Sequence, residues 1–436
     1  MDFKLSYATD GNVVKLSKAR GEPDWLLKDR LQALEAFGKI PVESLPLFVR
    51  HTDIKGVDVA KLEPPEAIDS SPVRPVYDGG DKAALGVIDE GKIQEIRITK
   101  KLREREFYFN EAVGLLEKKP DLAMTLLARP GGLPANEKFG MMSRALFSTA
   151  FIIYIPPRIE ITLPIHLLWR FSEESSSLVT RTIIYLSEGS RASIIEEFES
   201  GDSKEGQSLF GNATEVYLED GAGLRYAAIE RFGDHVVAFL TRQAILNRDC
   251  SLNQALGSFG GFLCKSRADC ALAGQGSNIR QVEVVYGNGT EKFDNTNFVV
   301  HEGRDTTSDL LSKAVMQERS RSALKGVITI QESALNSDSY LGQHSMLLSR
   351  KAKSTAIPSL EIKTNEVQRA KHAASVAQLD EEQLFYLMSR GLPRDEARKM
   401  LVEAFLTPIV EQVDLPQARE RIYDIINQKW VGQGFP

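Results

Sequence analysis

Cysteine and histidine are scarce in this 436-residue sequence, which contains three cysteines and six histidines. Cys250, Cys264 and Cys270 are too few and too closely spaced to form the disulfide framework of a secreted protein of this size, and they fit a reducing cytosol in which thiols stay free. The sequence also lacks a Gly-x4-Gly-Lys-Ser/Thr loop, a His-Glu-x-x-His motif and a Gly-x-Ser-x-Gly motif. These absences argue against a self-contained ATPase, metalloenzyme or hydrolase.

A strong excess of charge and a long hydrophobic run are missing as well. The 54 basic and 60 acidic residues leave a net charge of −6, which rules out a strongly basic nucleic-acid binder. The most apolar stretch, residues 147–157, ends in two prolines and is far shorter than the roughly 20 residues that a membrane span needs. Charged residues such as Lys4 and Asp10 interrupt the N-terminal segment, so no signal peptide is expected. We therefore expect a cytoplasmic protein.

The residues that are present indicate a globular chain with three zones. Hydrophobic residues make up 42% and charged residues 26% of the sequence, as in folded domains. Residues 1–145 are predicted to be helical and irregular, with a helix over 25–37 that ends at Gly38 and a proline-rich connector over 41–84. Residues 146–376 are predicted to be β structure, and residues 377–436 helical.

The middle zone consists of short runs rich in β-branched and aromatic residues, separated by turn residues. Examples are residues 150–155, 181–186 and 281–286, with turns such as Gly274-Gln275-Gly276 between runs. Strand, small turn and strand recur at loosely similar intervals without a strict motif. This quasi-repetition favours a β-solenoid over a β-sandwich, although a sandwich also contains many short strands.

The last zone carries clear helix signals. Asp380 is predicted to cap a helix that ends at Gly391. A second helix is expected to begin near Pro393, with Pro408 beyond its end, and a third pattern covers residues 416–430.

Two sets of side chains are candidates for metal ligands. Cys264 and Cys270 would face the same side of one continuous strand and could supply two thiolates, but residues 268–276 resemble a strand end and a turn, and burial in the β core is the favoured interpretation. His372 lies at the junction between the β zone and the C-terminal helices, followed by the small residues 373–375. Its imidazole could bind a metal, or it could be an ordinary hydrogen-bonded histidine at a domain junction.

Six segments carry more specific motifs: residues 21–34 (GEPDWLLKDRLQAL), 321–328 (RSALKGVI), 345–349 (SMLLS), 357–362 (IPSLEI), 372–376 (HAASV) and 380–391 (DEEQLFYLMSRG). Together they resemble the SufB/SufD family of iron–sulfur cluster assembly scaffolds, and the SufD side of it in particular. The last two segments are the most specific, and the similarity is dense from about residue 300 onward.

The resemblance implies a right-handed parallel β-helix between helical terminal regions and a non-catalytic scaffold role. It implies pairing with a SufB-like subunit through the ends of the β-helix and docking of a SufC-like ATPase on the C-terminal helices. The nucleotide chemistry would then belong to the partner, in keeping with the missing phosphate-binding loop. No tightly bound cofactor is expected, only a transient cluster at the partner interface.

The resemblance also assigns residues. His372 matches the family histidine at the subunit interface where a cluster is built, which makes it a candidate cluster or iron ligand. The residues that the resemblance assigns to the ATPase dock, each of which could instead be internal core, are Phe385, Tyr386, Arg390, Met400 and Phe405.

Three alanines depart from the family pattern. Ala352 and Ala373 stand where SufB-type chains carry a cysteine and a glutamate, and Ala370 stands where SufD-type chains carry a cysteine. The departures favour the accessory, SufD-like role, with any thiolate in a shared site coming from the partner. A homodimeric SufB/SufD-type scaffold stays open as an alternative. A carbohydrate-active β-helix enzyme is disfavoured because no export signal and no repeat-spaced acidic cluster is found.

Overall fold

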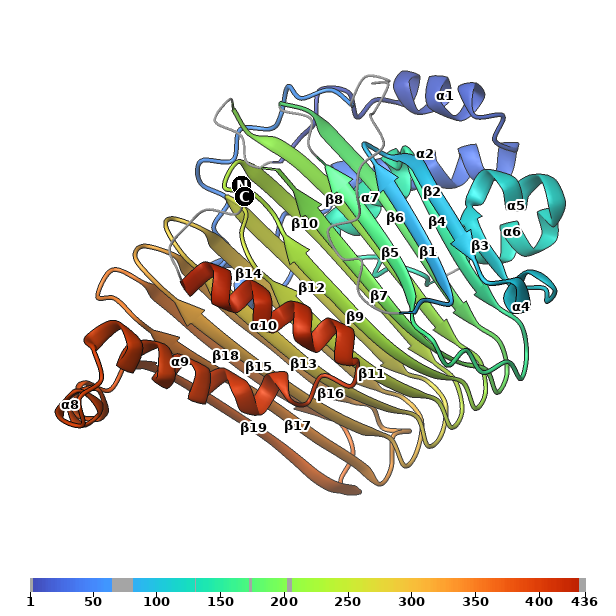
Figure 1. The fold of residues 1–436 in the computed structure, drawn as a ribbon. Coiled ribbons are helices and arrows are strands. Elements are labelled where there is room, and N and C mark those ends of the chain that lie inside the picture. Colours follow the sequence, from blue (N-terminus) through green and yellow to red (C-terminus); the bar gives the residue numbers. More distant parts are fainter. Residues whose placement is uncertain (1–2, 65–80, 130, 172–174, 202–205, 431–436) are drawn as a thin grey trace.

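The computed structural model describes residues 3–64, 81–129, 131–171, 175–201 and 206–430. These residues form two large sheets with helices against their outer faces (Figure 1). The 10-stranded sheet has the order β19 (Val367–Gln378), β17 (Ser337–Leu347), β15 (Thr307–Met316), β13 (Asn278–Gly287), β11 (Ser251–Ser258), β9 (Gly223–Arg231), β7 (Arg191–Ser200), β5 (Ile165–Phe171), β1 (Ala84–Asp89) and β2 (Lys92–Ile98). The 9-stranded sheet has the order β18 (Lys353–Ile362), β16 (Arg321–Ile330), β14 (Lys292–His301), β12 (Leu263–Leu272), β10 (Val236–Leu246), β8 (Ser208–Leu218), β6 (Ser177–Leu186), β4 (Thr149–Ile155) and β3 (Tyr108–Glu111).

From β4 onward the chain winds as a β-solenoid of about eight turns, which confirms the predicted fold class. Successive strands alternate between the two sheets, and each strand pairs in parallel with the strand one coil away, as β10 does with β8 and β12. Alternate side chains point between the sheets. There they form one hydrophobic core that extends along the solenoid, from Phe151 through Leu240 to Leu341.

The turns stack as closely as the strands do. Gly189 donates its backbone N–H to Asp220 of the next turn at 2.9 Å. A Cβ atom on Gly274 would lie 2.1 Å from the backbone nitrogen of Arg248, so only glycine allows this approach of two turns. The turn glycines that suggested a repeating fold in the sequence therefore mark the corners of the coils.

Helices cover the outer faces of both sheets. On the 9-stranded sheet lie α1 (Asp10–Ala19), α2 (Asp24–Lys39) and α7 (Lys138–Leu146), while α3 (Pro46–Val49) lies in the adjoining segment. On the 10-stranded sheet α9 (Arg394–Val410) and α10 (Pro416–Trp430) pack against β7 to β15, and α8 (Glu381–Ser389) projects beyond them (Figure 1). None of the helices in the described ranges is long and apolar enough to cross a membrane.

The first and last coils end differently. At the first, β2 and β3 pair antiparallel with β1 and β4, and α4 (Lys100–Arg103), α5 (Ala112–Lys118) and α6 (Pro120–Leu127) lie beside them. At the last, β18 and β19 are the outermost strands of the two sheets, and no described strand pairs with their outer sides. The strands β2 and β3 are outermost at the first end, but there Leu102 of α4 closes the interior core. We therefore call the first end covered and the last end open.

Several local predictions need correction. Residues 1–145 contain β1, β2 and β3 besides helices, because the apolar run over 84–88 turns at Glu90 and Gly91 into a second strand. Gly38 lies inside α2, and Pro408 lies inside α9 instead of beyond it. The proline-rich connector over 41–84 falls partly outside the described residues. Asp380 caps α8 as predicted, its carboxylate accepting from the backbone N–H of Glu382 at 2.9 Å.

Candidate functional site at the open end

His372 lies on the outermost strand of the open end and is exposed to solvent. Its register partner on β17 is Leu341, a member of the interior core, and Ala370 two residues earlier packs against that same core. Residues paired across parallel strands share a face, as do residues two apart on one strand. His372 therefore belongs to the inner face of the solenoid and is exposed because no further coil covers it.

The open end is both hydrophobic and rich in unpaired backbone groups. Ile362 at the end of β18 keeps 45% of its surface exposed, and Val376 on β19 keeps 42%. Exposed edge strands present unpaired N–H and C=O groups that can accept another strand. The end thus combines a hydrogen-bonding edge with apolar side chains, as a pairing surface would.

Beneath the last coil lies a set of polar side chains that the sequence argument did not single out. The Ser322 hydroxyl donates to Ser354 at 2.7 Å, and Ser354 donates to Ser345 at 2.8 Å, across the inside of the solenoid. Gln343 and Ser339 lie on the same inner row of β17 and are fully buried. Polar residues at inward positions of otherwise apolar strands were the signal that could have revealed them.

No thiolate of this chain joins His372. Cys264 and Cys270 both lie on β12, which runs to Leu272 before the turn, and both point into the interior core. Burial in the core is therefore the correct interpretation, and the strand continues farther than the sequence suggested. Burial raises the pKa of both thiols, and it raises the pKa of the buried Cys250 thiol to about 11. Across the described residues, no three His, Cys, Asp or Glu side chains converge as metal ligands.

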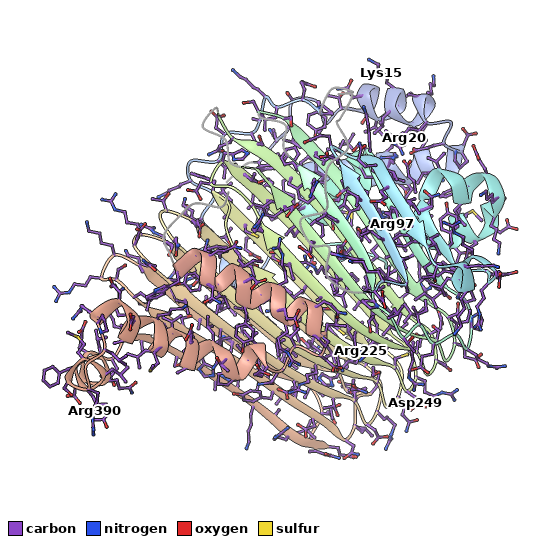
Figure 2. The ribbon with its side chains drawn as sticks, in the orientation of Figure 1. Lys15, Arg20, Arg97, Arg225, Asp249 and Arg390 are labelled. Atoms are coloured by element: carbon purple, nitrogen blue, oxygen red, sulfur yellow. The ribbon has the colours of Figure 1, made fainter. Side chains whose placement is uncertain are left out.

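The residues assigned to ATPase docking fall into two groups. Phe385 and Tyr386 on α8 are 72% and 56% exposed, and Met400 on α9 is 46% exposed. Arg390 donates to the Tyr386 hydroxyl at 3.0 Å and lies at the tip that projects from the body of the molecule (Figure 2). Phe405 instead is half-buried against the core beneath α9, where the Lys313 ammonium lies 4.6 Å from its ring centre. Four of the five side chains thus face solvent, and Phe405 belongs to the packing.

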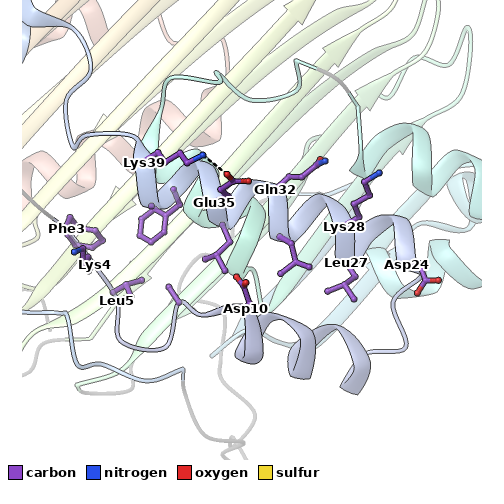
Figure 3. A pocket seen from close by; sticks show the side chains of 15 residues that line it. Phe3, Lys4, Leu5, Asp10, Asp24, Leu27, Lys28, Gln32, Glu35 and Lys39 are labelled. Carbon is purple, nitrogen blue, oxygen red and sulfur yellow. Dashed lines mark hydrogen bonds and ion pairs between the residues drawn. The ribbon is translucent and has the colours of Figure 1, made fainter.

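A hollow of about 960 Å³ lies elsewhere, between the N-terminal segment and α2 (Figure 3). Its apolar lining includes Phe3 of the N-terminal segment and Leu27 and Leu31 of α2, and Glu35 forms an ion pair with Lys39 beside it. All of its lining residues come from the first 39 positions. The hollow therefore shares no residue with the open end or with α8.

Comparison with known proteins agrees with this geometry. The family model "SUF system FeS cluster assembly, SufBD core domain" matches residues 169–405, more than half of the chain. The iron–sulfur cluster assembly protein SufD of Bacillus subtilis is 25% identical over 425 residues, which cover 95% of this chain and 96% of the relative. An iron–sulfur cluster assembly SufBD family protein of Staphylococcus epidermidis is 24% identical over 428 residues, 94% of this chain and 91% of the relative. The resemblance inferred from the sequence motifs is thus confirmed.

Proposed function

The chain belongs to the SufBD family of SUF-system iron–sulfur cluster assembly proteins, and from this premise we propose that it is a non-catalytic scaffold subunit. It pairs through its open end with a SufB-like subunit, and a SufC-like ATPase docks on α8 and the adjoining part of α9. His372 supplies an imidazole to a nascent cluster or iron site at the subunit interface. The cluster is cargo that the complex builds and releases.

The observation that supports this proposal best is the difference between the covered first end and the open last end of the solenoid. At the first end Leu102 of α4 closes the interior core behind the short antiparallel strands β2 and β3, whereas at the last end β18 and β19 leave Ile362 and Val376 exposed. A bare sheet edge is an aggregation hazard that proteins normally protect. Its retention beside His372 is explained if a second protein covers it.

The chemistry at His372 fits a shared site. A neutral imidazole is a good ligand for iron, but one imidazole cannot hold a cluster by itself. Ala352, Ala370 and Ala373 offer no ligand atoms from their side chains. The thiolates that iron–sulfur clusters require therefore come from the partner, and the site is complete only in the assembled pair.

Exposed aromatic side chains support the ATPase docking surface. Phe385 and Tyr386 stand on a helix whose only buried residue is Leu384, so these rings are not needed to fold the chain. Exposed aromatic and methionine side chains are typical anchors of protein interfaces. Met400 adds a third such side chain on α9, the helix that follows α8 and contacts it.

The test compares two histidines in a complex reconstituted with SufB-like and SufC-like subunits. His372→Ala is expected to lower cluster formation, measured by visible absorption after anaerobic addition of ferrous iron and sulfide, while size-exclusion chromatography shows an intact complex. His344→Ala is the matched control, because His344 lies on the neighbouring strand β17 but its imidazole faces outward, bonded to Ser375 at 2.8 Å. Equal cluster yields from His372→Ala and the wild type would contradict the role of His372.

A further inference from the structure

A row of polar side chains runs through the interior of the solenoid, and its members satisfy one another. Glu196 on β7 accepts a hydrogen bond from the indole of Trp169 at 3.0 Å. Several coils later, Glu283 on β13 accepts from the Ser312 hydroxyl on β15 at 2.7 Å. Buried polar groups are tolerated in a core when such partners are present. Up to β15 these interior side chains have partners, although single atoms such as Asn295 Oδ1 and Arg242 Nε are left unpaired.

On β17 two buried polar side chains lack hydrogen-bonding partners in the described part of the chain. Gln343, the register neighbour of Ser312, is 0% exposed, yet neither its amide nitrogen nor its amide oxygen has a hydrogen-bonding partner among the described residues. The hydroxyl of Ser339, also 0% exposed and on the same inner row, lacks a partner too. Leaving buried donors and acceptors unpaired destabilises a folded chain, and native structures contain few such groups. Other strands also carry unpaired polar atoms, but among the described residues Gln343 is the one side chain with two of them, and it calls for a functional explanation.

Both unpaired groups lie directly under the outermost strand, on either side of His372. In the register of β17 with β19, Ser339 is opposite Ala370, Leu341 is opposite His372, and Gln343 is opposite Ala374. The alanine methyl groups cannot hydrogen-bond, so each unpaired group is covered by a small apolar side chain. The imidazole and the two polar groups together form one row beneath the open end.

The described residues of the 9-stranded sheet on the opposite side of the interior supply no side-chain hydrogen-bonding partner for the Gln343 amide either. Gln343 reaches across the interior to Gly326 of β16, where a Cβ atom would lie 3.2 Å from its amide nitrogen. The residue above Gly326 on β18 is Pro358, which has no N–H to donate. Glycine, proline and alanine thus surround the amide, and none of their side chains satisfies it.

We propose that Gln343 and Ser339 are the hydrogen-bonding floor of the His372 site and that each donates to an anionic sulfur atom, either inorganic sulfide or a thiolate of the partner, that enters through the open end. The inference rests on the proposed function. Neutral amide and hydroxyl donors in an apolar setting suit a large, weakly hydrated anion, and hydrogen bonds to cluster sulfurs adjust cluster stability and potential. Gln343 and Ser339 are positioning residues, and His372 is the ligand.

The first test measures stability on the chain alone. Gln343→Met keeps the volume of the side chain but removes the unpaired amide, so we expect the thermal unfolding midpoint to rise by roughly 2–4 °C. The matched control is Gln281→Met on β13, which is also buried but donates to Asn297 at 2.7 Å and accepts from Gln254 at 3.2 Å. That variant loses made bonds and is expected to lower the midpoint. A drop for Gln343→Met matching that of Gln281→Met would overturn the inference, since it would mean that internal water satisfies the amide.

The second test measures function in the complex with SufB-like and SufC-like subunits, supplied with ferrous iron and sulfide. Gln343→Met is expected to reduce cluster yield about tenfold, because a hydrogen bond to a charged acceptor is lost, and Ser339→Ala should add to the loss. A stabilised variant with unchanged cluster yield and unchanged pairing overturns the inference but leaves His372 as a ligand. A normal yield from His372→Ala instead contradicts the proposed function.

Pairing measured without iron and sulfide separates the two sources of sulfur. If a partner thiolate is held, Gln343→Met weakens cluster-free pairing under reducing conditions. If inorganic sulfide is held, pairing keeps its wild-type affinity and only cluster yield falls. Either result supports the hydrogen-bonding floor and identifies its ligand.

Discussion

The two ends of the solenoid differ in how the interior core is closed at the outermost coil. At the first end β3 pairs antiparallel with β4 and buries Phe109 against Phe151, with ring centres 4.8 Å apart. At the last end β18 and β19 expose Ile362, Val376 and the inner face around His372. A stack of identical coils has no intrinsic reason to end, so each end needs a cap. The first end is capped by its own chain, and in the proposed complex a partner covers the last end.

The difference separates residues that stabilise the chain from residues that serve assembly. Removing a buried side chain costs both its transfer free energy and the cavity left behind, whereas an exposed side chain costs little. Substitutions at the first end should therefore change folding, and those at the last end should change pairing.

The largest expected effect is at the covered end. Phe109→Ala removes a ring that is 2% exposed within the interior core, and we expect it to lower the free energy of unfolding by about 3–5 kcal/mol. The comparison variant is Leu360→Ala on β18, which is only half-buried and should cost roughly 1 kcal/mol in the isolated chain. Urea unfolding of the isolated chain measures both, and equal costs would remove the distinction between the ends.

We expect acid to lower the free energy of unfolding through a buried histidine in the enclosed coils. Burial lowers the pKa of His301 on β14 to about 4 from its usual 6.5. Because the unfolded chain then binds the proton more readily, this contribution to stability is fully present above about pH 6.5 and is lost as the pH falls toward 4. The loss attributable to His301 is at most about 3 kcal/mol.

The pH effect is measured by urea unfolding at several pH values between 7 and 4. His301→Gln should flatten the dependence relative to the wild type, whereas His372→Ala at the open end serves as the control for removing an exposed imidazole. A variant at His301 with an unchanged slope would show that other groups cause the acid sensitivity.

The next effect is on pairing. Ile362→Asp combined with Val376→Asp places two charges on the open end, and we expect affinity for a SufB-like partner to fall about 10- to 30-fold with little change in the stability of the isolated chain. Met124→Asp is the control, because Met124 is 46% exposed on α6 at the covered end. Analytical ultracentrifugation of the mixed chains reports the affinity. Equal loss with Met124→Asp would break the assignment of pairing to one end.

The fold was largely predictable because its signals are local. Turn glycines at coil corners and runs of β-branched residues indicated the solenoid, and Asp380 marked the start of α8. Pro408 was predicted to lie beyond the second C-terminal helix because proline disfavours a helix interior. It lies inside α9 because Ile409 and Val410, which follow it in the helix, are fully buried and hold the last turn in helical form.

The candidate site was predictable only in part. The motif around His372 could be recognised from the order of residues, but the burial of Gln343 and its lack of partners depend on register between β17 and β19 and on Gly326 in the opposite sheet. Such relations between distant residues are fixed by stacking of whole coils. These relations cannot be predicted from single positions in the sequence. For the same reason the sequence left both docking and internal core open for Phe405.

The smallest expected effect concerns α8, the element that projects farthest from the covered parts of the chain (Figure 1). Leu384 is the only buried residue of this helix, so its folding depends unusually on its N-cap, where Asp380 accepts from the backbone N–H groups of Glu382 and Gln383 at 2.9 and 3.2 Å. Asp380→Ala should destabilise α8 by about 1 kcal/mol, seen as faster amide exchange confined to this helix. Asp380→Asn, which keeps an accepting oxygen, should restore most of the protection. Asp380 closely follows Gln378, the last residue of β19, but its carboxylate bonds to α8, so we expect pairing to be unchanged while ATPase affinity falls. A fall in pairing as well would show that α8 also takes part in the interface.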